Sequence, residues 1–209
     1  MEGDGTTLNP LSGRSARDGS ILTMNTNIDS KEMVFAIIDE VGLDIDYIRN
    51  KEGSPAGRLY FTGIELAIYV ASGVLASFFL GFAKEIFEEF GKEVGKAIVK
   101  EAGKATGAAI GKAVIERLKG IVNRILKSTP ESAQDAQQQS LLVQQELDDL
   151  IKGDLGKFIS TREVKDRELA YVYAVREVKT YLLKSGLTEA IATAHSERVV
   201  KIIKIKLSD

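Results

Sequence analysis

Residues 66–83 read LAIYVASGVLASFFLGFA, eighteen consecutive residues without a charge in a chain that is 28% charged. As a helix this run would measure about 27 Å, close to the roughly 30 Å of a bilayer's hydrocarbon core. Its length lies near the lower limit for spanning, and the small residues Ala, Ser and Gly dilute its hydrophobicity. The run therefore predicts either a membrane-inserting helix or a buried helix at the centre of a soluble bundle.

We take membrane insertion as the leading expectation and the core helix as its alternative. Glu65 stands at the edge of the run, where a charge is tolerable in either case. The residues expected to insert are the larger apolar ones, namely Leu66, Ile68, Val70, Val74, Leu75, Phe78, Phe79, Leu80 and Phe82.

The composition favours an all-α protein of one or two domains. Among 209 residues there are only 3 prolines, and helix-forming Ala, Glu, Lys and Leu are plentiful. We expect a helical bundle with one central, strongly apolar helix, a Gly/Lys-rich helix pair and a C-terminal helical domain. The chain has no cysteine, which excludes disulfides, a thiol nucleophile and cysteine metal sites. The net charge of −2 argues against an overall basic nucleic-acid binder.

The charge is unevenly distributed along the chain. Residues 1–65 carry a net charge of −5, residues 84–127 a net charge of +4, and residues 131–160 a net charge of −4. The positive excess thus follows the apolar run directly. If the run spans a membrane, the positive-inside rule places its Lys84 end on the cytoplasmic face.

The first 58 residues predict a tail followed by one helix and a loop. Residues 1–27 are polar, lack the apolar region of a signal peptide and are expected to be disordered, with Met24 as an alternative start. Residues 28–58 are expected to hold an N-terminal helix and a loop. Asp29 and Glu32 are spaced as a capping box, and Gly42 is a plausible C-cap that another turn or two would follow.

Residues 59–127 form the region expected to be membrane-active. Beyond the apolar run, glycine recurs at four-residue spacing, with lysine on the adjacent row. The expected helix-packing glycines are Gly91, Gly95, Gly103, Gly107 and Gly111. The expected lipid or lumen contacts are Lys92, Lys96, Lys100, Lys104 and Lys112. The pattern resembles a glycine zipper, in which repeated G-x-x-x-G lets helix backbones approach closely.

A strict period of four does not stay on one face, because each step of four advances a row by about 40°. The apolar residues of 84–127 accordingly fall into two clusters about 170° apart. The first cluster is Phe87, Phe90, Val94 and Ile98, and the second is Ile110, Val114, Leu118, Ile121 and Ile125. We therefore expect either two helices separated by a bend near residues 103–111, or one long helix with partners on opposite sides.

Residues 128–209 predict a C-terminal helical domain. Ser128-x-x-Glu131 and Ser160-x-x-Glu163 are spaced as capping boxes. The first predicted helix ends at residues 153–156, and Gly186 is expected to cap the second. Thr188 is expected to open the last helix, and the tail KIIKIKL either continues that helix or forms a short edge strand.

No arrangement of residues predicts catalysis. The single histidine, His195, is followed by Ser196 and Glu197, and neighbouring helical positions point in different directions, so these three cannot form a triad. No phosphate-binding loop or dinucleotide fingerprint is present in the sequence. We expect no enzyme, no cofactor, no metal and no nucleic-acid partner.

The leading function is therefore a membrane-associating protein that oligomerises and permeabilises a bilayer. At the level of motifs, residues 60–126 resemble glycine-zipper, membrane-permeabilising effectors of toxin and abortive-infection systems. The resemblance implies anionic lipids and further copies of the chain as partners, with a possible protein partner at residues 131–207. The expected localisation is cytoplasmic or peripheral, with movement to a membrane. The alternatives are a soluble all-α adaptor or assembly protein and a constitutive single-span membrane protein.

Overall fold

The computed structural model describes residues 29–50, 61, 63–89, 105–159 and 168–208. Their helices are α1 (Ser30–Asn50), α2 (Gly63–Lys84), α4 (Ala105–Lys127), α5 (Ala133–Leu150), α6 (Gly156–Ile159), α8 (Glu168–Lys184) and α9 (Glu189–Ser208). Two π-helical turns, η2 (Glu85–Glu89) and η4 (Ile151–Leu155), extend α2 and α5. Every regular element in the described ranges is helical, which confirms the predicted all-α bundle.

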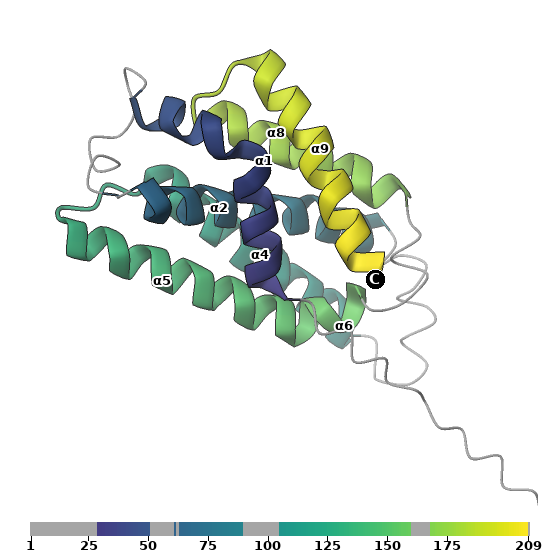
Figure 1. Cartoon of the computed structure of the whole chain (residues 1–209). Helices are drawn as coiled ribbons and strands as arrows, with labels where there is room; N and C mark the ends of the chain where they lie inside the picture. The colour runs from purple at the N-terminus through teal and green to yellow at the C-terminus, as the bar shows by residue number, and fades with distance from the viewer. Residues whose placement is uncertain (1–28, 51–60, 62, 90–104, 160–167, 209) are drawn as a thin grey trace, which may run out of the picture.

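Helix α2 lies at the centre of the bundle (Figure 1). It packs against α8, α4, α1 and α5, which together surround it. Every residue from 66 to 83 is buried except Ile68, which is partly buried. The central, strongly apolar helix predicted from the sequence is thus confirmed, and it is enclosed by helices of mixed polarity.

One hydrophobic core joins α2 to the rest of the bundle. It extends from Met33 and Ile37 in α1 to Val199 and Ile203 in α9. Helix α4 contributes most of the second predicted apolar cluster: Val114, Leu118, Ile121 and Ile125 are buried, and Ile110 is partly buried. In the first cluster Phe87 packs partly buried against the core, while Phe90, Val94 and Ile98 lie outside the described residues.

Two predicted helix ends are confirmed by their hydrogen bonds. At the start of α1, Oδ1 of Asp29 accepts from the backbone N–H groups of Lys31 and Glu32, at 2.9 and 3.3 Å. At the end of α8, Gly186 has a φ of 109°, and the N–H of Leu187 donates to the carbonyl of Leu182 at 3.1 Å. This is the Schellman arrangement, in which the left-handed position favours glycine.

Two other predicted helix ends are wrong. Helix α1 does not end at Gly42 but continues to Asn50, since a glycine permits a helix to end but does not require it to. Ser128 does not cap the helix that follows it. Ser132 does so instead, accepting from the N–H of Asp135 at 3.2 Å, while the Ser128 hydroxyl bonds to the side chain of Gln139.

The C-terminal helices follow the remaining expectations. The helix of residues 133–150 breaks at Gly153, whose φ of −87° and ψ of −129° are not helical. The cationic tail completes α9 and forms no strand. Helix α8 is described from Glu168, and the predicted capping box at Ser160 lies outside the described residues.

Candidate functional site

The most extensive helix contact of α2 is with α8, and glycine makes its close approach possible. A Cβ added to Gly81 would lie 2.5 Å from the carbonyl oxygen of Tyr173 and 2.7 Å from the Cα of Ala174. A Cβ added to Gly73 would overlap the ring of Tyr181, whose hydroxyl donates to the Val70 carbonyl at 3.3 Å. The backbones of the two helices are therefore nearly in contact at Gly81, whereas at Gly73 the ring of Tyr181 lies between them.

An aromatic cluster fills the neighbouring side of this interface. The ring of Phe78 stacks on Phe82 at 5.7 Å between centroids and meets Phe79 edge-on at 5.1 Å. The ring of Tyr171 in α8 meets the ring of Phe82 with 5.2 Å between centroids. The ammonium of Lys204 lies 4.7 Å from the Tyr171 centroid. Two of the phenylalanines expected to face lipid, Phe78 and Phe82, thus face Tyr171 of α8, with the Lys204 cation beyond it.

The polar groups of α2 differ in how they are satisfied. The hydroxyl of Ser72 donates to the Ile68 carbonyl of its own helix at 2.7 Å. Ser77 is 1% exposed, and within the described part of the chain its hydroxyl has no hydrogen-bond partner. At the C-terminal end, Lys84 pairs with Glu177 of α8 at 2.7 Å, and both side chains are about three-quarters buried. The helix is therefore apolar along its length and joined ionically to α8 at its end.

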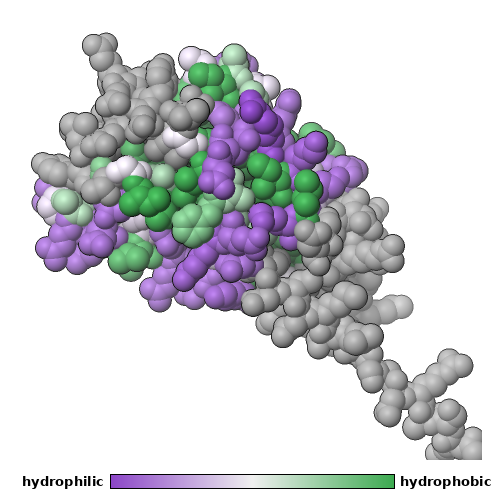
Figure 2. Space-filling model, in the orientation of Figure 1, coloured by the Kyte–Doolittle hydropathy of each residue, from purple (hydrophilic) through white to green (hydrophobic). Residues whose placement is uncertain are grey.

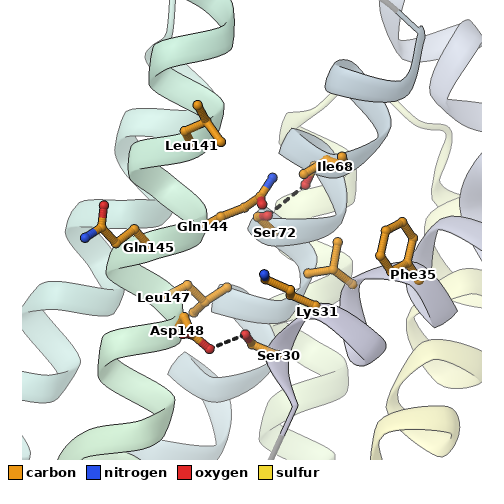
Figure 3. Close-up of a pocket in the computed structure, with 11 residues that line it drawn as sticks. Ser30, Lys31, Phe35, Ile68, Ser72, Leu141, Gln144, Gln145, Leu147 and Asp148 are labelled. Carbon is orange, nitrogen blue, oxygen red and sulfur yellow. Dashed lines mark hydrogen bonds between the residues drawn. The ribbon is translucent and has the colours of Figure 1, made fainter.

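A groove of about 730 Å³ runs along α2 between α1 and α5 (Figure 3). Its apolar lining includes Phe35, Ile68 and Leu141, and Phe35 and Leu141 are more than half exposed. At one end the Ser30 hydroxyl donates to Asp148 at 2.6 Å, which joins α1 to α5. In the orientation of Figure 1, Figure 2 shows apolar side chains across the middle of this face, with hydrophilic ones along its lower edge.

The titration of Asp148 reflects its position in this groove. Burial raises the pKa of its carboxyl, but hydrogen bonds from Lys152 and Ser30 favour the charged form more strongly, so the pKa lies below its ordinary value. The pKa of Lys152 is raised by the same pair, which measures 2.6 Å. The charged carboxylate is thus the form that holds α1 against α5.

Ion pairs also join α1 to α9 on the outside of the bundle. Glu40 accepts from Arg198 at 3.1 Å and lies 3.2 Å from Nδ1 of His195, which is 6% exposed. Lys206 pairs with Glu32 at 2.5 Å. His195 is therefore part of the α1–α9 contact, and within the described residues no group of three His, Asp or Glu side chains is placed to hold a metal ion.

The predicted site residues fall into three sets. All nine membrane-inserting residues lie in α2, and all are buried except the partly buried Ile68. Gly111 is buried against the ring of Phe87, and Lys112 is exposed. Gly107 lies in α4. The other members of the two rows lie outside the described residues, namely Gly91, Gly95, Gly103, Lys92, Lys96, Lys100 and Lys104.

A second small-residue row, not predicted above, lies inside the apolar run itself. Gly73, Ser77 and Gly81 recur at four-residue spacing and form the surface against which α8 packs. The signal was the same G-x-x-x-G periodicity found further along the chain, with serine at the central position.

Length and composition single out one element of the described chain as able to cross a membrane, the continuous helix Gly63–Phe87. Comparison with family models, curated proteins and solved structures finds no match to this chain. The functional features of the described residues are therefore this helix, its enclosure by the surrounding helices and the groove beside it.

Proposed function

We propose that this protein is a membrane-permeabilising protein that stores a bilayer-length helix in the centre of a water-soluble bundle. In the stored form, α2 is covered by amphipathic helices. On activation, the cover opens, α2 enters the bilayer, and the chain oligomerises there. The observation that carries this proposal is the 25-residue helix Gly63–Phe87, which is long and apolar enough to cross a membrane and whose apolar window is 94% buried.

Helix α4, one of the helices around α2, is suited to a membrane surface. Helix α4 has five basic residues and one acidic residue among its 23 residues. Its exposed cations include Lys112, Arg117 and Arg124. Its opposite face is the buried apolar one. A helix with an apolar face and a cationic face lies stably at an anionic lipid surface. Helix α4 can therefore exchange its contacts with α2 for contacts with lipid.

Besides the apolar core, polar contacts help to hold α2 in the bundle. The Lys84–Glu177 pair joins the end of α2 to α8, and the Ser30–Asp148 bond closes α1 over α5 beside it. A signal that separates these pairs would weaken the contacts around α2 without unfolding each helix. In the stored form the ring of Phe87 covers Gly111. The glycine row can therefore take part in oligomerisation only after Phe87 has moved away from Gly111.

A soluble all-α adaptor or assembly protein is the second candidate. It is favoured by the same burial, since a helix with 94% of its apolar window enclosed is already satisfied as a core element. In this case the exposed Phe35 and Leu141 beside the groove would be the place where a partner binds. The two candidates differ in whether α2 ever leaves the bundle.

A reversible lock on α2 separates the two candidates. The chain has no cysteine, so Lys84→Cys and Glu177→Cys introduce the only thiols. These side chains meet in the bundle, and a bismaleimide with a disulfide in its spacer can bridge them. We expect the unbridged variant to bind and release dye from phosphatidylcholine/phosphatidylglycerol vesicles. We expect the bridged protein to release little dye, and reduction of the spacer to restore the release.

The matched control is the same double variant capped with a monofunctional maleimide, which modifies both thiols without joining them. If leakage is the same in the bridged and capped proteins, α2 does not leave α8 and the storage mechanism is wrong. If neither protein binds or permeabilises the vesicles while the circular dichroism shows a folded helical protein, the adaptor function is favoured.

A further inference from the structure

The face of α2 that α8 covers has the properties of a helix-association surface. Gly73, Ser77 and Gly81 occur at successive steps of four and lie within about 80° of one another around the helix. In a bilayer, faces of small residues at this spacing let two helices approach until their backbones touch. The larger apolar residues Leu75 and Phe79 lie outside this row.

The structure shows that this face already accepts a helix at backbone distance. At Gly81 the backbone of α8 is so near that an added Cβ would lie 2.7 Å from the Ala174 nitrogen. At Gly73 the place of a second backbone is taken by the ring of Tyr181. Helix α8 is thus an imperfect partner for this face, touching it closely at one glycine and through a side chain at the other.

Ser77 supplies an independent observation. Its side chain is buried, with 1% of its surface exposed, and among the described residues its hydroxyl has no hydrogen-bond partner. Ser72, five residues earlier, shows that a serine of this helix can bond to its own backbone. A buried hydroxyl that makes no bond is unfavourable in the folded bundle, and in hydrocarbon it would favour a partner that provides an acceptor.

Helix α8 is not suited to accompany α2 into a bilayer. Helix α8 carries the charged residues Arg176, Glu177 and Lys179, and charges at the centre of a membrane are costly. If α2 inserts, it must therefore leave α8, and the Gly73–Ser77–Gly81 face loses its cover. Lipid chains fill a groove of small residues less well than a second helix does.

We infer that, in the bilayer, the Gly73–Ser77–Gly81 face of α2 binds the same face of α2 in a second copy of this chain, with the Ser77 hydroxyl donating across the contact. This inference rests on the proposed function, because the face is free only after α2 has inserted. In the stored form α8 then acts as an internal substitute for the second copy, and it prevents association until the bundle opens.

The test measures association of the inserted full chain in vesicles. Ile64→Cys places a single thiol at the exposed start of α2 for donor or acceptor dyes. Full-length protein is reconstituted from detergent into phosphatidylcholine/phosphatidylglycerol vesicles, so that no activating signal is needed. Energy transfer between labelled copies, measured as the protein-to-lipid ratio is changed, gives the dissociation constant in the bilayer.

Two serine variants provide the decisive comparison. We expect Ser77→Ala to raise the dissociation constant about threefold, the usual effect of losing one interhelical hydrogen bond in a membrane. We expect Ser72→Ala to leave the dissociation constant unchanged, because the Ser72 hydroxyl bonds within its own helix. Ser77→Leu, which fills the groove, should raise the constant at least tenfold. Since the protein is reconstituted from detergent, a weakened bundle does not affect these readings.

Vesicle flotation and dye release from the same samples distinguish the possible failures. If the protein floats with the vesicles and releases dye but Ser77→Leu associates like the unchanged chain, the association face is wrong and the proposed function stands. Equal effects of Ser72→Ala and Ser77→Ala also overturn the inference. If α2 does not insert at all, the proposed function fails, and this inference fails with it.

Discussion

Gly81 and Ala174 bring the backbones of α2 and α8 into direct contact, so that a Cβ on Gly81 would lie 2.7 Å from the Ala174 Cα. Backbone atoms cannot move aside as a flexible side chain can. The two helices can therefore lie this close together only because Gly81 has no Cβ. Since α8 is the principal neighbour of α2, the stability of the bundle depends on this contact.

Gly81→Ala should destabilise the bundle by about 1–3 kcal/mol, the usual cost of forcing extra volume into a packed core. The effect opposes the intrinsic preference of helices for alanine over glycine, which alone would give a gain of up to about 1 kcal/mol. Urea unfolding followed by circular dichroism measures the difference.

Gly120→Ala is the matched control for this substitution. Gly120 lies within α4, is exposed, and has no heavy atom within 4 Å of an added Cβ. We expect it to stabilise the protein by about 0.4–1 kcal/mol, chiefly by restricting the unfolded chain. Stabilisation by both substitutions would show that α2 and α8 are not in backbone contact.

The second glycine contact predicts a coupling between two residues. An added Cβ at Gly111 would overlap the ring of Phe87, whose Cγ would lie 2.5 Å away. Gly111→Ala alone should therefore destabilise the protein. In a Phe87→Ala background the same change should cost less, because the ring is gone. A double-mutant cycle by urea unfolding should give a coupling energy of about 0.5–3 kcal/mol, and additivity would place the ring elsewhere.

The fold could be predicted from the sequence where one physical signal dominated. The uncharged run 66–83 determined the central helix, and the apolar cluster around Val114 and Leu118 determined the buried face of α4. The end of α1 could not be predicted, because Gly42 permits a C-cap without requiring one. Ser128 and Ser132 both offer a capping hydroxyl, and the choice between them depends on the partner Gln139, which the local sequence does not reveal.

The candidate site could be predicted only in part from the sequence. The apolar run could be identified, but nothing in its composition indicated which of its faces meets α8. That depends on Tyr173, Ala174 and Tyr181, about a hundred residues further along the chain. The Gly73–Ser77–Gly81 face therefore becomes apparent only when the tertiary contacts are known, although its spacing is visible in the sequence.

The Ser30–Asp148 bond predicts a pH-dependent contribution to stability. The pKa of Asp148 is lowered in the folded protein, so its contribution is complete above the unfolded value of about 3.9 and is lost as the pH falls through the lower folded value. Ser30→Ala should cost about 1 kcal/mol at pH 7, and this cost should decrease as the pH is lowered from about 4 towards 2. Urea unfolding over this pH range measures the difference.

Thr193→Ala is the control for the pH dependence. The Thr193 hydroxyl donates to the Glu189 carbonyl within α9, and neither group titrates in this contact. Its effect on stability should be the same at pH 7 and at pH 2. A pH-independent effect of Ser30→Ala would show that the hydroxyl does not act through the Asp148 carboxylate.

The Lys84–Glu177 pair predicts a change in membrane activity that is larger than the change in stability. Glu177→Gln removes the charge that holds the end of α2 to α8, and a partly exposed pair contributes only about 0.2–1 kcal/mol to folding. If the Lys84 end of α2 must separate from α8 before insertion, losing the ion pair favours the separated form by the free energy that the pair contributed. The initial rate of dye release should then rise by up to about fivefold, the factor that 1 kcal/mol corresponds to.

Glu189→Gln provides the comparison within the same part of the bundle. Glu189 pairs with Lys179 at 3.0 Å, so its replacement removes an ion pair between α8 and α9 without touching α2. It should have a similarly small effect on urea unfolding and no effect on dye release. Equal acceleration by the two variants would mean that general loosening of the bundle, and not release of the Lys84 end of α2, limits permeabilisation.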